Sequence, residues 1–295
     1  MSGFGQEPPR LDSAAFAAQG AQVKDVIAKR MVNVVYQPIV DLRTRKLFAY
    51  EALVRCPIPE FASPPALFHA AENHGVTGEL GRVIREIAVE RCTGSPLFLN
   101  IHPSELNQKW VVQPNDPIFT HDQDIYLEIT EGVPLSHFQL CQTILGEVRG
   151  RGVFLVVDDF GAGYSNIKYI ADLNPRVVKL DRGLIAGLTR DSRMFKLVRW
   201  IVALCKEMDA VVVAEGIETL TELEAVREAG ARLGQGYLLA RPAFPPPEVN
   251  WPGAARFIEE DETRGSMQIK TEAAMRPSVT SSVSPPVATR PGRRS

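Results

Sequence analysis

The chain has 295 residues, of which 45% are hydrophobic and 23% are charged, with a formal net charge of −2 at pH 7. This composition is typical of a globular protein with one large barrel or two ordinary domains, and it lacks the basic field that would predict a nucleic-acid partner. No apolar stretch approaches the roughly 20 residues of a membrane span, and the first residues lack the pattern of a secretory signal. We therefore expect a cytoplasmic protein whose four widely spaced cysteines are reduced thiols.

The predicted elements follow a flexible N-terminal segment, residues 1–20, which is rich in Gly, Pro, Ala and Gln. Short apolar runs predict eight strands, over residues 32–40, 47–55, 97–101, 125–130, 153–158, 177–180, 211–215 and 233–237. The segments between them predict helices over residues 65–74, 77–91, 134–149, 165–171, 192–208 and 221–229. Ser192 and Thr221 are predicted helix N-caps, and Glu224 would complete a capping box with Thr221.

The order of these elements predicts the topology. Strands that alternate with helices imply βαβ units and a mostly parallel sheet, and eight of them favour a closed barrel. Residues 41–46 link the first two strands, and a link of hairpin length cannot make a parallel crossover. We therefore predict an α/β fold, a modified (β/α)₈ TIM-like barrel with an antiparallel first strand, over residues 21–250. Residues 251–295 are predicted to form a mostly disordered tail.

Polar side chains stand at the carboxyl ends of the predicted strands, where α/β barrels bind their ligands. In the clearest case, an apolar run from Val153 to Val157 ends on Asp158 and Asp159, whose charges repel unless a cation lies between them. The other residues of this kind are Glu51, Asn100, Glu128, Lys179, Asp181, Glu215, Glu218 and Gln235. Solvated loop charges explain the set poorly, because burying so many charges together without a metal is costly. Oxygen ligands favour Mg²⁺ or Mn²⁺ over Zn²⁺, and we interpret His102 and His121 as loop residues.

Six segments, in order, resemble motifs of the EAL family of cyclic di-GMP phosphodiesterases. They are Tyr36–Val40, Glu51–Arg55, Asp158–Ser165, Val178–Arg182, Ala214–Thr219 and Gln235–Pro242. The resemblance runs from about residue 24 to residue 246 and agrees with the hairpin argument for an antiparallel first strand. It implies a bacterial protein that hydrolyses cyclic di-GMP to linear pGpG with two Mg²⁺ or Mn²⁺ ions in each active site.

The resemblance also implies which residues bind the metals and the substrate. The implied metal ligands are Glu51, Asn100, Glu128, Asp158, Asp159 and Glu215. Asp158 would bridge the two ions. The implied substrate-binding residues are Gln37, Arg55 and Gln235, with Arg55 placed to meet a phosphate.

Four residues are implied to support the reaction: Lys179, Glu215, Glu131 and Glu218. Lys179 would contact the attacking water and Glu218 would support the site. Whether Glu215 or Lys179 acts on that water stays open. Glu131 would anchor the loop Phe160–Ile167, which together with the following helix is implied to form a homodimer contact.

Two departures from the family pattern bear on the substrate rather than on the metals. Cys56 stands where the family usually has a tryptophan, and His102 stands where it usually has a small hydroxyl residue. Two other functions are compatible with the motifs or with the ligands. A catalytically inactive receptor would bind cyclic di-GMP in the same groove, and a turnover assay distinguishes it. An unrelated barrel would use magnesium carboxylates and a lysine base for proton abstraction, which substrate profiling would reveal.

Overall fold

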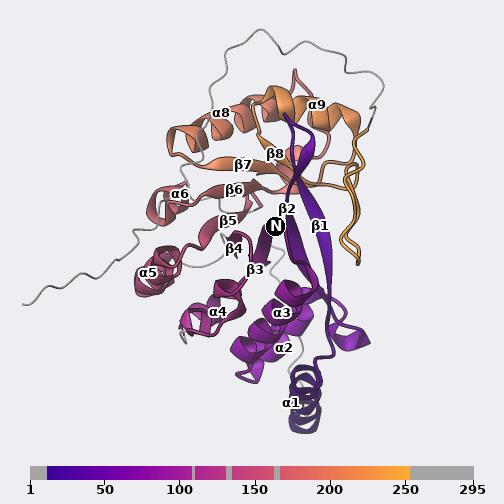
Figure 1. The fold of residues 1–295 in the computed structure, drawn as a ribbon, viewed down its shortest axis with the longest axis vertical. Coiled ribbons are helices and arrows are strands. Elements are labelled where there is room, and N and C mark those ends of the chain that lie inside the picture. The colour runs from indigo at the N-terminus through magenta and orange to yellow at the C-terminus, as the bar shows by residue number, and fades with distance from the viewer. Residues whose placement is uncertain (1–11, 108–109, 131–134, 163–166, 253–295) are drawn as a thin grey trace, which may run out of the picture. The chain divides into compact units, whose positions relative to one another are not determined.

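The computed structural model describes residues 12–107, 110–130, 135–162 and 167–252 (Figure 1). The strands are β1 Asn33–Asp41, β2 Lys46–Arg55, β3 Leu97–Asn100, β4 Ile125–Thr130, β5 Phe154–Phe160, β6 Val177–Leu180, β7 Val211–Ala214 and β8 Leu233–Gly234. The α-helices are α1 Ser13–Ala28, α2 Pro64–Asn73, α3 Thr77–Arg91, α4 Pro103–Asn107, α5 Leu135–Gly150, α6 Lys168–Leu173, α7 Arg182–Ile185, α8 Arg193–Glu207 and α9 Leu220–Glu228. Short 3₁₀ helices cover Pro59–Phe61 (η1), Trp110–Val112 (η2) and Pro117–Phe119 (η3).

The strands form one closed barrel in the order β1 to β8. Strand β1 runs antiparallel to both of its neighbours, β2 and β8, whereas every other neighbouring pair is parallel. This confirms the predicted α/β barrel and its antiparallel first strand. The physical reason is the short turn between β1 and β2, which returns the chain at once and leaves no room for a crossover helix.

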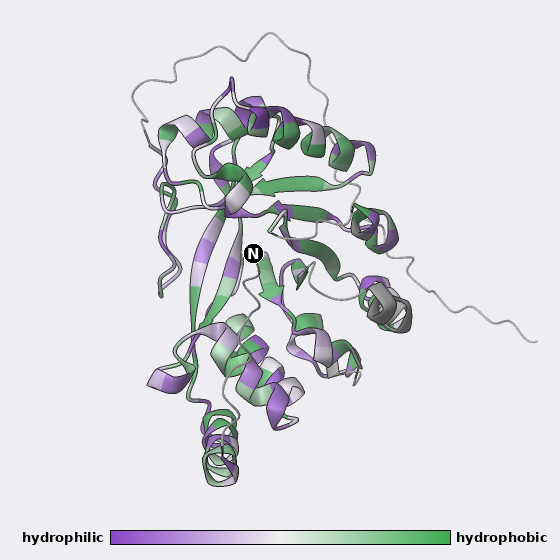
Figure 2. Ribbon diagram, turned by 180° about the vertical axis from the view of Figure 1, so that it is seen from behind, coloured by the Kyte–Doolittle hydropathy of each residue, from purple (hydrophilic) through white to green (hydrophobic). Residues whose placement is uncertain are grey.

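Apolar residues pack on both sides of the barrel wall. A small cluster fills its interior, with one residue from each strand: Ile39, Ala49, Phe98, Tyr126, Val156, Val177, Val213 and Leu233. The larger cluster lies between the strands and the surrounding helices. Helix α8 contributes to this larger cluster, because its buried residues recur every three or four positions and its other face is exposed. Figure 2 shows this alternation along α8 and the hydrophobic character of the central strands.

Several local features differ from the sequence-based expectations. Helix α1 includes residues 13–20, which the composition predicts to be poorly ordered, and it packs on α2 through Phe16, whose ring lies 4.2 Å from that of His74. Ser192 caps α8 as predicted. The N-cap of α9 is Thr219, which forms a capping box with Glu222, so the prediction of Thr221 with Glu224 is wrong. Strand β8 ends at Gly234 and is shorter than predicted.

Two further expectations can be compared with the described residues. Cys56, Cys92 and Cys205 are buried and unpaired. Among the described residues, no helix combines the length and the apolar character that crossing a membrane requires. The predicted disordered tail lies outside the described residues from residue 253 onward.

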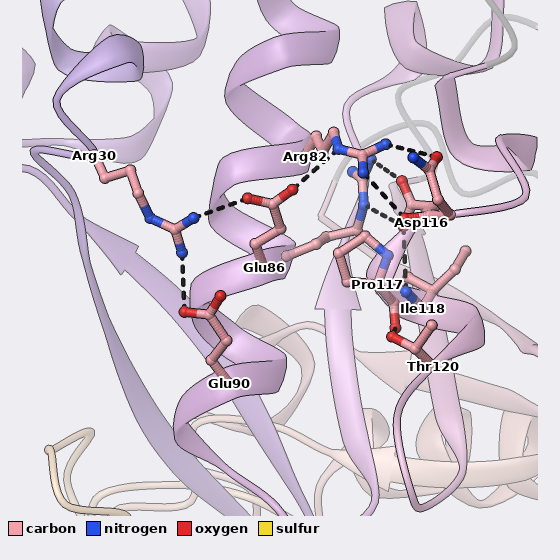
Figure 3. Close-up of polar contacts among 10 residues, drawn as sticks. Arg30, Arg82, Glu86, Glu90, Asp116, Pro117, Ile118 and Thr120 are labelled. Atoms are coloured by element: carbon pink, nitrogen blue, oxygen red, sulfur yellow. Dashed lines mark hydrogen bonds and ion pairs between the residues drawn. The ribbon is translucent and has the colours of Figure 1, made fainter.

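A buried ion cluster joins α3 to the segment that follows β3. The guanidinium of Arg85 lies 2.6 Å from Glu105 Oε2 and 2.8 Å from Asp116 Oδ2, and all three side chains are at most 1% exposed. Burial acts to lower the pKa of Arg85, but Glu105 and Asp116 outweigh it and raise that pKa. Outside the cluster, Figure 3 shows Arg30, beyond the end of α1, paired with Glu86 and Glu90 of α3.

We predict that Arg85→Met strongly destabilises the protein, because it leaves the carboxylates of Glu105 and Asp116 buried without a counter-ion. Losing one partner of a buried ion pair costs about 3–5 kcal/mol. Arg82→Met is the control, because the pair of Arg82 with Glu86 is part-exposed, and such a pair contributes only about 0–1 kcal/mol. Urea unfolding of both variants measures the difference. Equal midpoints for the two variants would contradict the importance of the buried cluster.

Candidate active site

The polar residues at the barrel mouth form a layer directly above the interior apolar cluster. Side chains alternate between the two faces of a strand, so residues two positions apart point to the same side. Two positions from each interior apolar residue, toward the mouth, the chain has Gln37, Glu51, Asn100, Glu128, Asp158, Lys179, Glu215 and Gln235. In the antiparallel strand β1 the polar residue precedes the apolar one; elsewhere it follows. Strand alternation therefore brings eight predicted site residues into one ring.

Lys179 is the cation at the centre of this ring. Four carboxylates surround its ammonium, with Nζ–O distances of 2.6 Å to Glu128, 2.7 Å to Glu215, 3.0 Å to Asp158 and 3.4 Å to Glu51. Burial acts to lower the pKa of Lys179, but the carboxylates outweigh it and hold that pKa well above its ordinary value. Burial raises the pKa of Glu128 well above its ordinary range, and the nearby charge of Glu51 adds to this effect.

Side-chain amides orient the carboxylate of Glu51. Gln235 Nε2 donates to Glu51 Oε2 at 2.5 Å and to Gln37 Oε1 at 3.0 Å. Asn100 Nδ2 donates to Glu128 Oε2 at 2.8 Å and to Glu51 Oε1 at 3.4 Å. Gln37 in turn donates to the carbonyl of Ala240. These contacts link β1, β2, β3, β4 and the segment after β8 across the mouth.

An irregularity in β5 brings two consecutive aspartates to the same site. The pairing of β5 with β6 shifts register between Val157 and Phe160, and Asp159 has a left-handed backbone with φ of 56°. In a regular strand the neighbouring side chains of Asp158 and Asp159 would point to opposite faces, whereas a bulge can redirect one of them. Carboxylate oxygens of Asp158, Asp159 and Glu215 lie within 4.8 Å of one another.

The charges and the unpaired atoms of this site fit divalent cations. Five carboxylates (Glu51, Glu128, Asp158, Asp159 and Glu215) against the single ammonium of Lys179 give a formal charge of −4, which two divalent cations would balance. Glu128 Oε1 and Asp158 Oδ1 are buried and accept no well-aligned hydrogen bond, although the ammonium lies within ion-pair distance of both. Hard oxygen ligands of this kind suit Mg²⁺ and Mn²⁺.

Comparison with known proteins identifies the family of the chain. The EAL domain model matches residues 21–242. The chain belongs to the EAL family. It is 29% identical over 265 residues to the cyclic di-GMP phosphodiesterase PA2567 of Pseudomonas aeruginosa, an alignment that covers 84% of this chain and 45% of that protein. The chain spans between 30% and 45% of the length of the first curated relatives that it matches.

Solved EAL structures share the fold. A complex of the Pseudomonas aeruginosa MucR phosphodiesterase with cyclic di-GMP superposes with a TM-score of 0.65 at 28% identity, covering 72% of this chain and 97% of that one. A complex of Klebsiella pneumoniae BlrP1 with manganese and cyclic di-GMP has a TM-score of 0.61 at 27% identity, covering 72% and 56% of the two chains.

In the structure of this EAL domain, two of the remaining predicted residues, Glu218 and Arg55, lie outside the ring. Glu218 lies at the rim and pairs with Arg182 at 2.9 Å. Arg55 is exposed at the end of β2, where its guanidinium donates to the carbonyl of Val54. Glu131 lies outside the described residues, as do residues 163–166 of the predicted dimer loop. The predicted roles of these residues stay predictions.

Two cavities flank the ring, and sequence reasoning missed most of their walls. One of about 740 Å³ extends from Glu51, Asn100 and Asp159 to one face of α2 and to the segment after β3. The other, of about 250 Å³, includes Arg182, Gly236 and Tyr237 on the side of Glu215 and Glu218. Residues 64, 65, 68, 69 and 72, which line the larger cavity, recur at helical spacing. In the sequence, this spacing is the one sign that these residues share a helix face and could line a cavity. The same spacing is equally typical of a helix face that packs on the core.

The pKa shifts of Asp159 and Glu215 predict how the stability of the metal-free protein depends on pH. Burial raises the pKa of Asp159 to about 6 and that of Glu215 to about 8, and the negative charge of Asp158 adds to both shifts. Both groups bind protons more tightly in the folded state than in the unfolded chain, so their contribution to stability is complete only below the unfolded values near about pH 4. It is lost as the pH rises through 6 and 8.

We therefore predict that the free energy of unfolding falls between pH 5.5 and pH 8.5 in a chelator, and that Mn²⁺ reverses the fall by replacing the protons. Urea unfolding at several pH values measures the slope. Glu215→Gln is the control, because it removes the group that titrates near pH 8 and should flatten the upper part of the profile. A metal-free profile that rises over this range would contradict the prediction.

Proposed function

We propose that this EAL domain is a metal-dependent phosphodiesterase that hydrolyses cyclic di-GMP to linear pGpG. The observation that carries the proposal is the ring of four carboxylates, one lysine and three amides at the barrel mouth, together with the adjacent carboxylate of Asp159. Relatives named as cyclic di-GMP phosphodiesterases support the choice of substrate. A receptor that binds without hydrolysis is the outcome to be distinguished.

The chemistry requires that negative charge be neutralised, because a phosphodiester is anionic and resists attack by hydroxide. The residues that would hold two divalent cations are Glu51, Asn100, Glu128, Asp158, Asp159 and Glu215. When bound, Mg²⁺ or Mn²⁺ supplies positive charge and favours ionisation of a water near neutral pH. BlrP1 has been solved with manganese and with calcium beside cyclic di-GMP, which supports a divalent site here.

Lys179 and Glu215 have different roles in this proposal. A lysine surrounded by four carboxylates keeps its proton, so Lys179 would orient the attacking water and stabilise the charge that develops on the phosphate. Glu215 is more accessible than Lys179, with a side chain 17% exposed against 1%. Because Glu215 also faces the two aspartates, it would accept the proton from the water.

The remaining predicted residues act around the reacting atoms in this proposal. Gln37 and Gln235 would hold the substrate backbone beside Glu51, which they already contact directly or through each other. Arg55 would swing from the carbonyl of Val54 to a phosphate. Glu218 and Glu131 would support the site, and the loop Phe160–Ile167 with α6 would contact a second copy of the chain.

We predict that Glu51→Ala abolishes hydrolysis while the fold survives. Glu51 is a metal ligand in this proposal and lies above the interior apolar layer, so its truncation leaves the packed interior intact. The measurement is pGpG formation from cyclic di-GMP with Mg²⁺ or Mn²⁺, alongside circular dichroism. Glu207→Ala, an exposed position on α8, is the control and should retain activity. A folded Glu51→Ala protein with full activity would refute the metal assignment.

Lys179→Ala should lower the hydrolysis rate by roughly 10² or more, the usual scale for a positioned electrostatic or proton-transfer group. Binding of cyclic di-GMP in calcium should change far less, because an interaction made mainly in the transition state affects turnover more than ground-state binding. Initial rates in magnesium and calorimetric affinities in calcium form the paired measurement, with Lys206→Ala as a control. Equal rates for mutant and wild type would show that Lys179 has no role in the reaction. Tight binding without pGpG under any divalent metal would establish the receptor.

A further inference from the structure

Helix α1 packs closely against the end of α2 (Figure 1). The ring of Phe16 lies 4.2 Å from that of His74, the residue directly after α2. Gly20, one turn further along α1, is buried, and a Cβ atom added there would lie 2.7 Å from His74 Nδ1. Because a Cβ atom does not approach a ring atom that closely, only glycine lets the backbone of α1 lie against His74 in this way.

Helix α1 also lies along α3. Arg30, just after α1, pairs with Glu86 and Glu90 of α3 at 2.9 Å each (Figure 3). The first half of α1 contacts His74, shortly before α3 begins, so the two helices run in the same direction. Glu79 is two turns before Glu86 on the same face of α3, which places it near the first half of α1.

Three buried polar atoms at this junction of α1, α2 and α3 weaken the docking of α1. Gln19 Oε1, His74 Nε2 and Glu79 Oε2 have no hydrogen-bond partner among the described residues. A buried polar atom without a partner opposes packing, because it has lost its contact with water. Apart from Gly20, the buried residues of α1 are Val23 and Val26, which stabilise only its second half. The first half is therefore docked less firmly.

Helix α2 connects this junction to the candidate active site. The backbone N–H of His74 donates to the carbonyl of Ala70 at 3.2 Å, so His74 is part of the hydrogen bonding that ends α2. Residues 64, 65, 68, 69 and 72 of the same helix line the larger cavity. A shift of His74 therefore moves the helix that forms this cavity wall. The described residues of α1 line neither cavity and belong to no part of the ring.

We propose that α1 is a regulatory element of this domain. Its docking against His74 holds α2 in the position that binds substrate, and its displacement weakens binding without changing the chemistry at the ring. Residues 12–18 are exposed, so a contact that draws them away from α2 acts directly on the weaker half of the helix. The inference rests on the proposed function for the identity of the substrate.

Two variants of the full chain test this regulation in opposite directions. Gly20→Ala adds a methyl group against His74 and should displace α1, although alanine favours the helix itself. Gln19→Met removes an unpartnered buried amide while keeping a side chain of similar length, and should dock α1 more firmly. The matched control is Gly146→Ala on α5, where an added Cβ meets nothing within 4 Å.

Hydrogen exchange of the ligand-free protein and kinetics with cyclic di-GMP are the measurements, with urea midpoints to confirm folding. Gly20→Ala should speed exchange in α2 and raise KM, and the dissociation constant in calcium, about tenfold with kcat unchanged. A tenfold loss is expected if about one molecule in ten keeps α2 in the binding position. Gln19→Met should slow exchange in the first half of α1. Gly146→Ala should match the wild type in every measurement.

The outcomes separate this inference from the proposed function. If the wild type hydrolyses cyclic di-GMP while folded Gly20→Ala behaves like Gly146→Ala, the regulatory role is refuted and the phosphodiesterase stands. Faster exchange in α2 with unchanged KM and affinity, or a lower kcat with unchanged KM, would also overturn it. If the wild type binds cyclic di-GMP without hydrolysis and Gly20→Ala binds about tenfold more weakly, the regulatory role stands and the enzyme assignment falls.

Discussion

The structure depends on the alternation of side chains along strands that close into a barrel. Because every second residue points inward, each strand contributes one apolar residue to the interior and one polar residue to the layer above it. Closure then forces the polar layer into one small ring, where Glu51, Glu128, Asp158 and Glu215 share the ammonium of Lys179. A single ammonium cannot balance that charge, so the fold itself creates a demand for protons or divalent cations.

The negative charge of the ring is stabilised differently on its two sides. Toward β5, the bulge at Asp159 adds a carboxylate next to Asp158 and Glu215, and burial makes Asp159 and Glu215 hold protons more tightly. Toward β1 and β8, the amides of Gln37 and Gln235 orient Glu51 without adding charge. The charged groups of the candidate site thereby lie at strand ends, which the barrel holds rigidly.

The walls of the larger cavity are formed mainly by a helix and a connecting segment rather than by strand ends. Helix α2 and the segment after β3 surround the space beside the ring, and the buried cluster of Arg85, Glu105 and Asp116 supports that segment from behind. Glu105 also accepts the backbone N–H of His102. Helices and loops therefore shape the cavity, whereas strand ends form the ring, a division of labour that is common in barrels.

Much of the fold and of the site could be predicted from the sequence, because strand periodicity and turn length are local properties. The apolar runs located all eight strands, the short link after β1 gave its antiparallel direction, and the polar residues at the strand ends identified the ring. Local signals failed where two patterns overlapped. Thr219 with Glu222 and Thr221 with Glu224 both fit a capping box, and only the path of the chain after β7 selects the first.

Other features required contacts between distant residues, and only the tertiary structure decided them. Helix α1 begins in a segment whose composition predicts flexibility, and it packs through Phe16 on His74. Asp159 adopts its left-handed backbone inside a bulge that depends on the register with β6. The stack of Phe68 on His102 joins residues far apart in the chain. The sequence by itself determined which residues end the strands, because alternation is local, whereas barrel closure decided which of them meet and what cavity lies beside them.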